Sequence, residues 1–239
     1  MEKEKIKITH ITRYAYPHIG GIEAFIEMLN YCVKSDDTNI EVLCNSNDTK
    51  PSLDAKGVFF NRAKYLFNFA ANSISFEYLW KLSKIETDII IYHMPCIFAV
   101  IAHFLCHPNY KKMVVCYHSD IIGYDKIMKP FWWIYKKFLK QADLIHVQSP
   151  QMVDNSMAKD YKNKTIMIPY LIDTSVKFNE ENVRKITTTA NGKKIIFALG
   201  RHVKYKGFKY LIEAMIDVKD AVLILGGKGP LTEEFKTYI

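Results

Sequence analysis

The sequence has no uninterrupted apolar run of the roughly 18 residues that a membrane-spanning helix needs, because Lys, His or Asn breaks its longest apolar clusters. Its first residues, Met1–Lys5, are mostly charged and predict no apolar core of a signal peptide. We therefore expect a cytoplasmic protein. Peripheral contact with the inner face of the membrane stays open as an alternative.

The cysteines lack any pairing or ligand pattern. No C-x-x-C or Cys/His ligand spacing occurs among the five, which are Cys32, Cys44, Cys96, Cys106 and Cys116. An odd number of scattered cysteines, mostly inside apolar runs, is typical of reduced thiols in a cytosolic protein. The sequence thus predicts neither a disulfide framework nor a metal site.

The sequence is rich in hydrophobic residues and carries a net positive charge. Of its 239 residues, 49% are hydrophobic and 24% are charged, a composition that excludes a disordered chain. The 33 Lys and Arg residues exceed the 25 Asp and Glu residues, which leaves a net charge of +8. This balance favours anionic partners such as acidic lipid headgroups, phosphorylated small molecules or nucleic acid. Nucleic acid ranks last because no recognition motif accompanies the charge.

Short β-rich runs alternate with longer helical patterns along most of the chain. Several of these runs are almost continuously hydrophobic, as in Ile89-Ile90-Ile91, which is typical of parallel strands covered by helices on both faces. The expected strands are 5–12, 40–44, 58–60, 88–93, 113–118, 143–148 and 165–169. The expected helices are 22–33, 63–84, 96–106, 127–140 and 151–158. This alternation predicts a doubly wound, Rossmann-like α/β domain over residues 1–172.

A polar stretch, residues 173–192, interrupts this rhythm and is expected to be a linker. The alternation then restarts, with expected strands at 194–199 and 221–225 and expected helices at 208–217 and 231–239. A doubly wound sheet uses five or six strands, so residues 193–239 predict only the start of a second α/β domain. We therefore expect a chain that is cut short within that domain.

Two adjacent glycines, Gly20 and Gly21, stand between the first expected strand and the first expected helix. Ligands of open α/β sheets bind beyond the carboxyl ends of the strands, where helix N-termini offer free N–H groups to anions. These glycines are therefore candidates for phosphate binding. A plain strand-to-helix turn is the alternative, and the absence of G-x-G-x-x-G argues against a dinucleotide fingerprint.

A second candidate site lies at His118 and Asp120, where a mid-domain strand is expected to end. Histidine at that edge can donate to a sugar hydroxyl or a phosphate oxygen, and Asp can orient it or accept from a substrate hydroxyl. Ordinary polar loop residues are the alternative. Because no G-x-S-x-G motif surrounds Ser119, a hydrolase nucleophile is not expected there.

Two cations, Arg201 and Lys206, follow the first strand of the second domain. Fixed cations beside a helix start suit a diphosphate leaving group, whose negative charge grows as its bond to carbon breaks. A solvated basic turn is the alternative. Glycines after the next strand, Gly227 and Gly229, are weaker candidates for bringing backbone amides to a nucleotide.

Two segments combine aromatic and basic residues. Residues 130–140 carry five aromatic residues and three lysines, and residues 62–84 contain six more aromatic residues. We expect most of these rings to belong to the core. The alternative is an amphipathic surface on anionic lipid headgroups.

The order of these motifs resembles the family 4 glycosyltransferases of the GT-B fold. The chain shows Gly-Gly-x-Glu, His-x-Asp, Ile-Pro-x-x-Ile-Asp, Gly-Arg-x4-Lys-Gly and Gly-x-Gly-Pro-Leu in that sequence. Residues 117–121 are similar to a branch that builds bacterial surface polysaccharides and often transfers mannose. The resemblance implies two Rossmann-like domains and a retaining, metal-independent transfer that needs no cofactor. The implied donor is a nucleotide-diphosphate sugar such as GDP-mannose or a UDP-hexose, and the implied acceptor is lipid-linked or a polysaccharide.

By position in these motifs, Arg201 and Lys206 would neutralise the departing diphosphate. The resemblance places Gly20 and Gly21 near the phosphates or the acceptor and His118 beside the transferred sugar. Asp120 is assigned to the acceptor side or to ordering of its loop. The leaving group's own oxygen would take the acceptor proton.

The sequence departs from the family in three places. Tyr170-Leu171 stand where the family usually has Asn-Gly, which predicts a stiffer hinge, and Lys228 replaces an acidic or small residue. The family's Glu-x7-Glu motif would lie beyond Ile239. An inactive binding or scaffold subunit that needs a partner chain to complete the donor site is therefore the alternative function.

Overall fold

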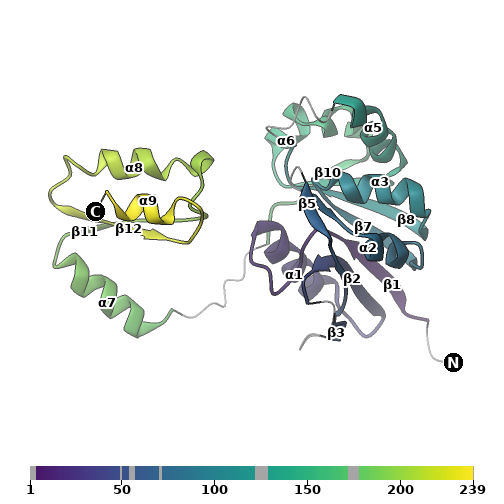
Figure 1. The fold of residues 1–239 in the computed structure, drawn as a ribbon, viewed down its shortest axis with the longest axis horizontal. Coiled ribbons are helices and arrows are strands. Elements are labelled where there is room, and N and C mark those ends of the chain that lie inside the picture. The colour runs from purple at the N-terminus through teal and green to yellow at the C-terminus, as the bar shows by residue number, and fades with distance from the viewer. Residues whose placement is uncertain are drawn as a thin grey trace. The chain divides into compact units, whose positions relative to one another are not determined.

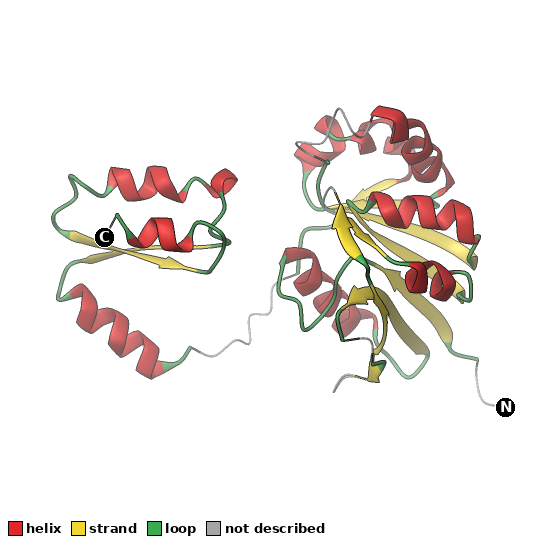
Figure 2. Ribbon diagram, viewed as in Figure 1, coloured by secondary structure: helices red, strands yellow, loops and turns green. Residues whose placement is uncertain are grey.

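The computed structural model describes residues 4–48, 50–53, 57–69, 72–121, 129–171 and 178–238. The chain divides into two compact units, Met1–Asp173 (unit 1) and Thr174–Ile239 (unit 2) (Figure 1). Both units combine helices with parallel strands (Figure 2), so the α/β class expected from the sequence is confirmed.

Unit 1 contains an eight-stranded sheet with the order β10-β9-β8-β7-β1-β2-β4-β3, in which only the pairing of β3 with β4 is antiparallel. Its strands are β1 (Ile6–Ile11), β2 (Thr38–Ser46), β3 (Ser52–Leu53), β4 (Phe59–Lys64), β7 (Glu86–Met94), β8 (Asn109–Tyr117), β9 (Leu144–Val147) and β10 (Thr165–Met167). The chain adds β2 and β4 on one side of β1 and then β7, β8, β9 and β10 on the other. The order therefore reverses between β1 and β7, and such a switch point is where open α/β sheets bind ligands.

Helices cover both faces of this sheet (Figure 1). Helix α1 (Gly21–Val33) packs on one face, and the other face carries α2 (Phe76–Leu82), α3 (Ile97–Cys106), α5 (Trp132–Gln141) and α6 (Pro150–Asn155). Successive residues of β7 divide between the two cores: Ile90 and Tyr92 pack with the α3 and α5 face, and Ile91 packs with the α1 face. This is why the strand is apolar at consecutive positions.

Unit 2 contains two parallel strands, β11 (Lys194–Leu199) and β12 (Ala221–Gly226), with α7 (Glu180–Ala190), α8 (Phe208–Ala214) and α9 (Thr232–Lys236). Phe208 and Phe235 form an edge-to-face pair in its core, with ring centroids 6.2 Å apart. The expected strands 194–199 and 221–225 are confirmed.

The helix expected over residues 63–84 is wrong for its first half. β4 continues its parallel register with β2 as far as Lys64, and a hairpin of β5 (Phe67–Phe69) and β6 (Asn72–Ile74) follows. The buried Ser75 then caps α2, because its hydroxyl oxygen accepts the N–H of Tyr78 at 3.0 Å. The helix therefore begins after this cap.

The expected linker also contains regular structure, because α7 occupies residues 180–190. The side chain of Asn179 caps the helix by accepting the N–H of Asn182 at 3.0 Å. Residues 173–177 of the expected linker lie outside the described residues, as do residues 70–71, 127–128 and 239 of three expected helices. All five cysteines are free thiols; Cys44, Cys96 and Cys116 are buried, whereas Cys32 is exposed. None of the described helices combines the length and the apolar character needed to cross a bilayer.

Candidate functional site

Four histidines stand at the carboxyl edge of the sheet in unit 1, one from each of four neighbouring strands. His10 is the penultimate residue of β1, His93 of β7 and His146 of β9, and His118 directly follows β8. Since these strands are parallel and adjacent, the imidazoles gather on one edge at the switch point between β1 and β7. The predicted residue His118 is thus one member of a larger cluster.

Three of these imidazoles form a continuous hydrogen-bonded row that ends on a tyrosine. Nδ1 of His10 lies 2.9 Å from Nε2 of His93, and Nδ1 of His93 lies 3.0 Å from Nε2 of His118. Nδ1 of His118 lies 2.6 Å from the hydroxyl of Tyr170, which follows β10. Both ring nitrogens of His118 are therefore occupied by protein partners.

The row is buried and uncharged at neutral pH. Burial lowers the pKa of His10 to about 4 and that of His118 to about 3, with the nearby His146 adding to the shift at His118. The pKa of His93 is well below its usual value because of burial and its three imidazole neighbours. Each ring therefore carries a single N–H, so each can donate one hydrogen bond and accept one.

Phe25 of α1 covers this cluster. Its ring is stacked on His146 at a centroid distance of 5.3 Å and meets His118 edge-on at 5.0 Å. The ring of Tyr170 lies tilted against it at 4.9 Å. Phe25 lies about one turn into α1, which starts at Gly21. The structure thus brings His118 and the start of α1 to the same end of the sheet.

The start of α1 already has an anion beside it. A Cβ placed on Gly20 would lie 2.3 Å from a carboxylate oxygen of Glu23, and the same carboxylate lies 3.8 Å from Nε2 of His18. Gly21 has open space around it. The predicted phosphate contacts of Gly20 and Gly21 stay predictions, and a phosphate there would have to displace Glu23.

Asp120 does not orient His118. Its carboxylate instead accepts a short hydrogen bond from the hydroxyl of the buried Tyr117. This bond ties the loop after β8 to the end of that strand. Of the two roles expected for Asp120, the contact fits ordering of the loop, and contact with an acceptor stays a prediction.

In unit 2, Arg201 and Lys206 flank the loop that connects β11 to α8. Both side chains are exposed, and no described carboxylate lies within ion-pair distance of either one. A short 3₁₀ turn, Lys204–Lys206, precedes Gly207, which has a φ of 70° and so suits glycine. The loop therefore presents two cations without a counter-charge among the described residues.

The glycines after β12 let two backbone segments approach each other. A Cβ on Gly227, where φ is 123°, would lie 2.0 Å from the carbonyl oxygen of Gly200, and one on Gly229 would lie 2.5 Å from the carbonyl oxygen of His202. The N–H of Gly229 donates to the hydroxyl of Thr232 at 2.8 Å. The nucleotide contacts expected from Gly227 and Gly229 stay predictions, and the amide of Gly229 is already bonded.

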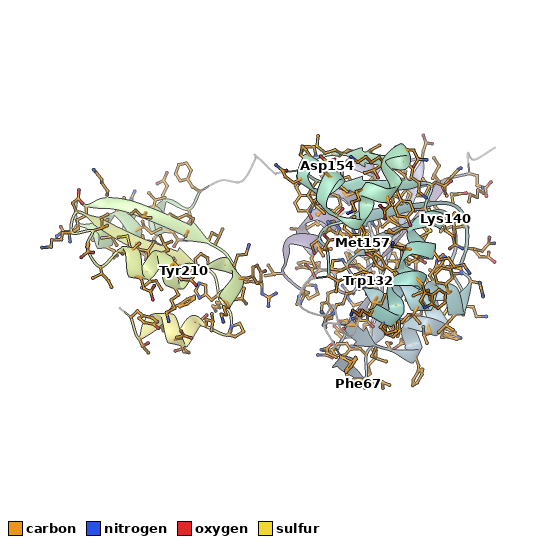
Figure 3. The ribbon with its side chains drawn as sticks, turned by 90° about the horizontal axis from the view of Figure 1, so that it is seen from above. Phe67, Trp132, Lys140, Asp154, Met157 and Tyr210 are labelled. Atoms are coloured by element: carbon orange, nitrogen blue, oxygen red, sulfur yellow. The ribbon has the colours of Figure 1, made fainter. Side chains whose placement is uncertain are left out.

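The two basic-aromatic segments divide between core and surface. In α5, Tyr135 and Phe138 are fully buried, whereas Trp133 is 67% exposed. The exposed rings of the other segment belong to Phe67, Phe69, Phe76 and Trp80, with Phe67 at the edge of unit 1 in Figure 3. The three lysines of α5, which are Lys136, Lys137 and Lys140, are exposed.

Sequence reasoning found His118 and missed its partners. His10, His93 and His146 lie inside strands that are rich in apolar residues, and the family resemblance indicates only a hinge role for Tyr170. One histidine near the end of each of four strands is a signal that could have found the row. The described residues contain no cluster of three or more His, Cys, Asp or Glu side chains suited to a metal ion.

Comparison with known proteins places these features in a family. A model of Glycosyltransferase Family 4 matches residues 19–176. The chain is 30% identical to the O-antigen chain mannosyltransferase C of Escherichia coli, covering 97% of this chain and 63% of that protein. It is 29% identical to the D-rhamnosyltransferase WbpZ of Pseudomonas aeruginosa, covering 96% of this chain and 61% of that protein. The chain thus spans less than two thirds of the length of either relative.

Solved structures share the fold. The catalytic domain of starch synthase IV from Arabidopsis thaliana, bound to ADP and acarbose, matches with a TM-score of 0.66 at 13% identity, over 98% of this chain and 71% of that one. The lipopolysaccharide outer core galactosyltransferase WaaB in its apo form matches with a TM-score of 0.55 at 15% identity, over 98% of this chain and 64% of that one. These likenesses confirm the expected GT-B fold class. With the family model matching most of the sequence, the chain belongs to glycosyltransferase family 4.

Proposed function

We propose that the protein transfers a mannosyl or rhamnosyl group from a nucleotide-diphosphate sugar during synthesis of a bacterial surface polysaccharide. The names of the two relatives, a mannosyltransferase and a rhamnosyltransferase, support this sugar class. GDP-mannose is the first donor to test and a UDP-hexose the second. The acceptor is a lipid-linked or polysaccharide glycan.

The observation that carries the proposal is the pair of unneutralised cations, Arg201 and Lys206, on the loop after β11. A guanidinium and an ammonium group held on one short loop suit a diphosphate, because Arg can bind phosphate oxygens in a bidentate way and Lys adds a point charge. The glycine at position 207 lets the chain turn directly after Lys206.

The chemistry follows from where charge develops. A hydroxyl of the acceptor attacks the anomeric carbon, the bond from that carbon to the diphosphate oxygen breaks, and the acceptor proton passes to a phosphate oxygen. In such a single-step transfer, retention of the anomeric configuration requires that attack and departure occur on the same face of the sugar. Arg201 and Lys206 stabilise the charge that grows on the diphosphate, so the reaction proceeds without a metal ion or other cofactor.

Membrane contact is the second part of the proposal. Helix α5 exposes Trp133 together with Lys136, Lys137 and Lys140, and α2 exposes Phe76 and Trp80. Indole rings suit the headgroup region, and lysines are attracted to acidic lipids. We place the protein in the cytoplasm, touching the inner face of the membrane where lipid-linked acceptors lie.

The experiment is a transfer assay with GDP-mannose or a UDP-hexose. Arg201→Ala and Lys206→Ala should each lower turnover at least ~100-fold, the scale of losing one preorganised electrostatic contact. Lys193→Ala is the matched control, since Lys193 precedes β11 at its amino end, away from the loop. Wild-type turnover in both loop variants would refute the assigned roles.

A further inference from the structure

The row formed by His10, His93, His118 and Tyr170 has a direction. Each imidazole is neutral and carries one N–H, so every hydrogen bond along the row must point the same way. Either Nδ1–H of His118 donates to the hydroxyl oxygen of Tyr170, or the Tyr170 hydroxyl donates to Nδ1 of His118. Which of the two holds decides whether the tyrosine hydroxyl has a hydrogen left to donate to a ligand.

The end of the row at His10 selects the direction. If the hydrogens ran toward His10, its Nε2 would carry a hydrogen, and no described residue accepts a hydrogen bond from that fully buried atom. A buried N–H without an acceptor is rare and costs free energy. If the hydrogens run toward Tyr170, Nε2 of His10 is bare and every imidazole hydrogen of the row has an acceptor. The second arrangement is therefore favoured.

We propose that Tyr170 is the end of this row that meets the substrate, and that its hydroxyl donates a hydrogen bond to an oxygen of the bound sugar. The Tyr170 oxygen accepts from Nδ1–H of His118, which leaves the tyrosine's own hydrogen free to point outward. His10, His93 and His118 then act as positioning residues through Tyr170. The identity of the ligand as a sugar rests on the proposed function, whereas the direction of the row does not.

The surroundings of Tyr170 fit this role. The residue is 37% exposed, and among the described residues its hydroxyl is hydrogen-bonded to His118 alone. The ring packs against Phe25 at a centroid distance of 4.9 Å, which fixes the direction of the C–O bond. Burial raises the pKa of Tyr170 to about 12, so the hydroxyl keeps its hydrogen at neutral pH. A donor whose oxygen already accepts a hydrogen bond is also polarised by that bond.

The direction is tested by ¹⁵N NMR of the histidine-labelled protein, which identifies the protonated nitrogen of each ring. The proposal predicts Nδ1–H at His10, His93 and His118. The same spectrum contains two internal controls of the opposite kind. Nε2 of His103 faces the carbonyl oxygen of Gln141 at 3.0 Å, and Nε2 of His146 faces a backbone carbonyl at 2.7 Å, so both must be Nε2–H. An Nε2–H at His118 overturns the proposal.

The contact with substrate is tested by Tyr170→Phe, which keeps the packed ring and removes the hydroxyl. We expect kcat/KM for release of nucleoside diphosphate from GDP-mannose or UDP-glucose to fall about fivefold to tenfold, the worth of one hydrogen bond. Tyr92→Phe is the matched control, because the fully buried Tyr92 hydroxyl is also bonded to an imidazole, that of His103, at 2.8 Å. Equal kcat/KM in the two variants overturns the contact. A wild type that is inactive with both donors contradicts the proposed function instead, and the NMR result still decides the direction of the row.

Discussion

The buried histidine row predicts that unit 1 loses stability in mild acid. In the unfolded chain a histidine has a pKa near 6.5, whereas burial lowers the pKa of His10 to about 4 and that of His118 to about 3. Between pH 6.5 and these values the unfolded state binds more protons than the folded state. The free energy of unfolding therefore falls as the pH falls through this window.

The magnitude depends mainly on the unfolded state. Lowering the pH from 7 to 5 protonates an unfolded histidine almost fully and leaves His10 and His118 almost uncharged, so each costs about 2 kcal/mol of stability. Together they account for about 4 kcal/mol, against the roughly 5–15 kcal/mol that stabilises a typical domain. His93, His103 and His146 act in the same direction, because burial lowers the pKa of each.

The assay is urea unfolding followed by tryptophan fluorescence at pH 7, 6 and 5. All three tryptophans, Trp80, Trp132 and Trp133, belong to unit 1, so the signal reports on that unit. Asp143 does not interfere, because the N–H of Met113 holds the pKa of this carboxyl below its usual range, and it titrates at lower pH. A free energy of unfolding that stays constant or rises from pH 7 to pH 5 would show that the buried histidines do not set the acid stability of unit 1.

Three further predictions concern unit 2 and the surface. Gly227→Ala should destabilise β11 and β12 by more than about 2 kcal/mol, because φ is positive there and the new Cβ would collide with the carbonyl oxygen of Gly200. Hydrogen exchange of the two strands measures this loss of stability. Gly21→Ala is the control, because Gly21 has open space around it and its substitution should not lower stability. Vesicles with anionic lipid should retain the protein and neutral vesicles should not, and equal partitioning would count against membrane contact. Trp133→Ser should weaken that retention, which co-sedimentation measures.

The parallel sheet could be predicted from the sequence because its strands are long and apolar on both faces. Residues 88–93 and 113–118 lie within or next to β7 and β8 for this reason. The hairpin within 63–84 could not, because its register depends on the distant strand β2 and its helix begins at a buried serine. Tertiary pairing there outweighed the local helical pattern.

Helix α7 carried local signals that the polar composition of its segment obscured. Asn179 is a helix cap, and the pairs Glu180–Arg184 and Glu181–Lys185 have the spacing of successive turns. Asn191 and Gly192 end the helix with positive φ. An exposed helix of this kind is read from its caps and ion pairs rather than from an apolar stripe.

Only part of the candidate site could be predicted from the sequence. Arg201 and Lys206 were found because a short loop with two cations is a local pattern, and His118 was found because it follows a strand. The partners of His118 could not be found in the same way, since the row assembles residues from β1, β7 and the segment after β10. Only the strand order brings them together.

If Arg201 and Lys206 bind the diphosphate of the donor, loss of either side chain should weaken the binding of a nucleoside diphosphate. Isothermal titration calorimetry measures the affinity of the protein for GDP and UDP, with GMP and UMP as the matched monophosphates. We expect tighter binding of the diphosphates, and loss of that difference in Arg201→Ala and Lys206→Ala but not in Lys193→Ala. Unchanged affinity for both diphosphates in the two loop variants would contradict diphosphate binding by Arg201 and Lys206.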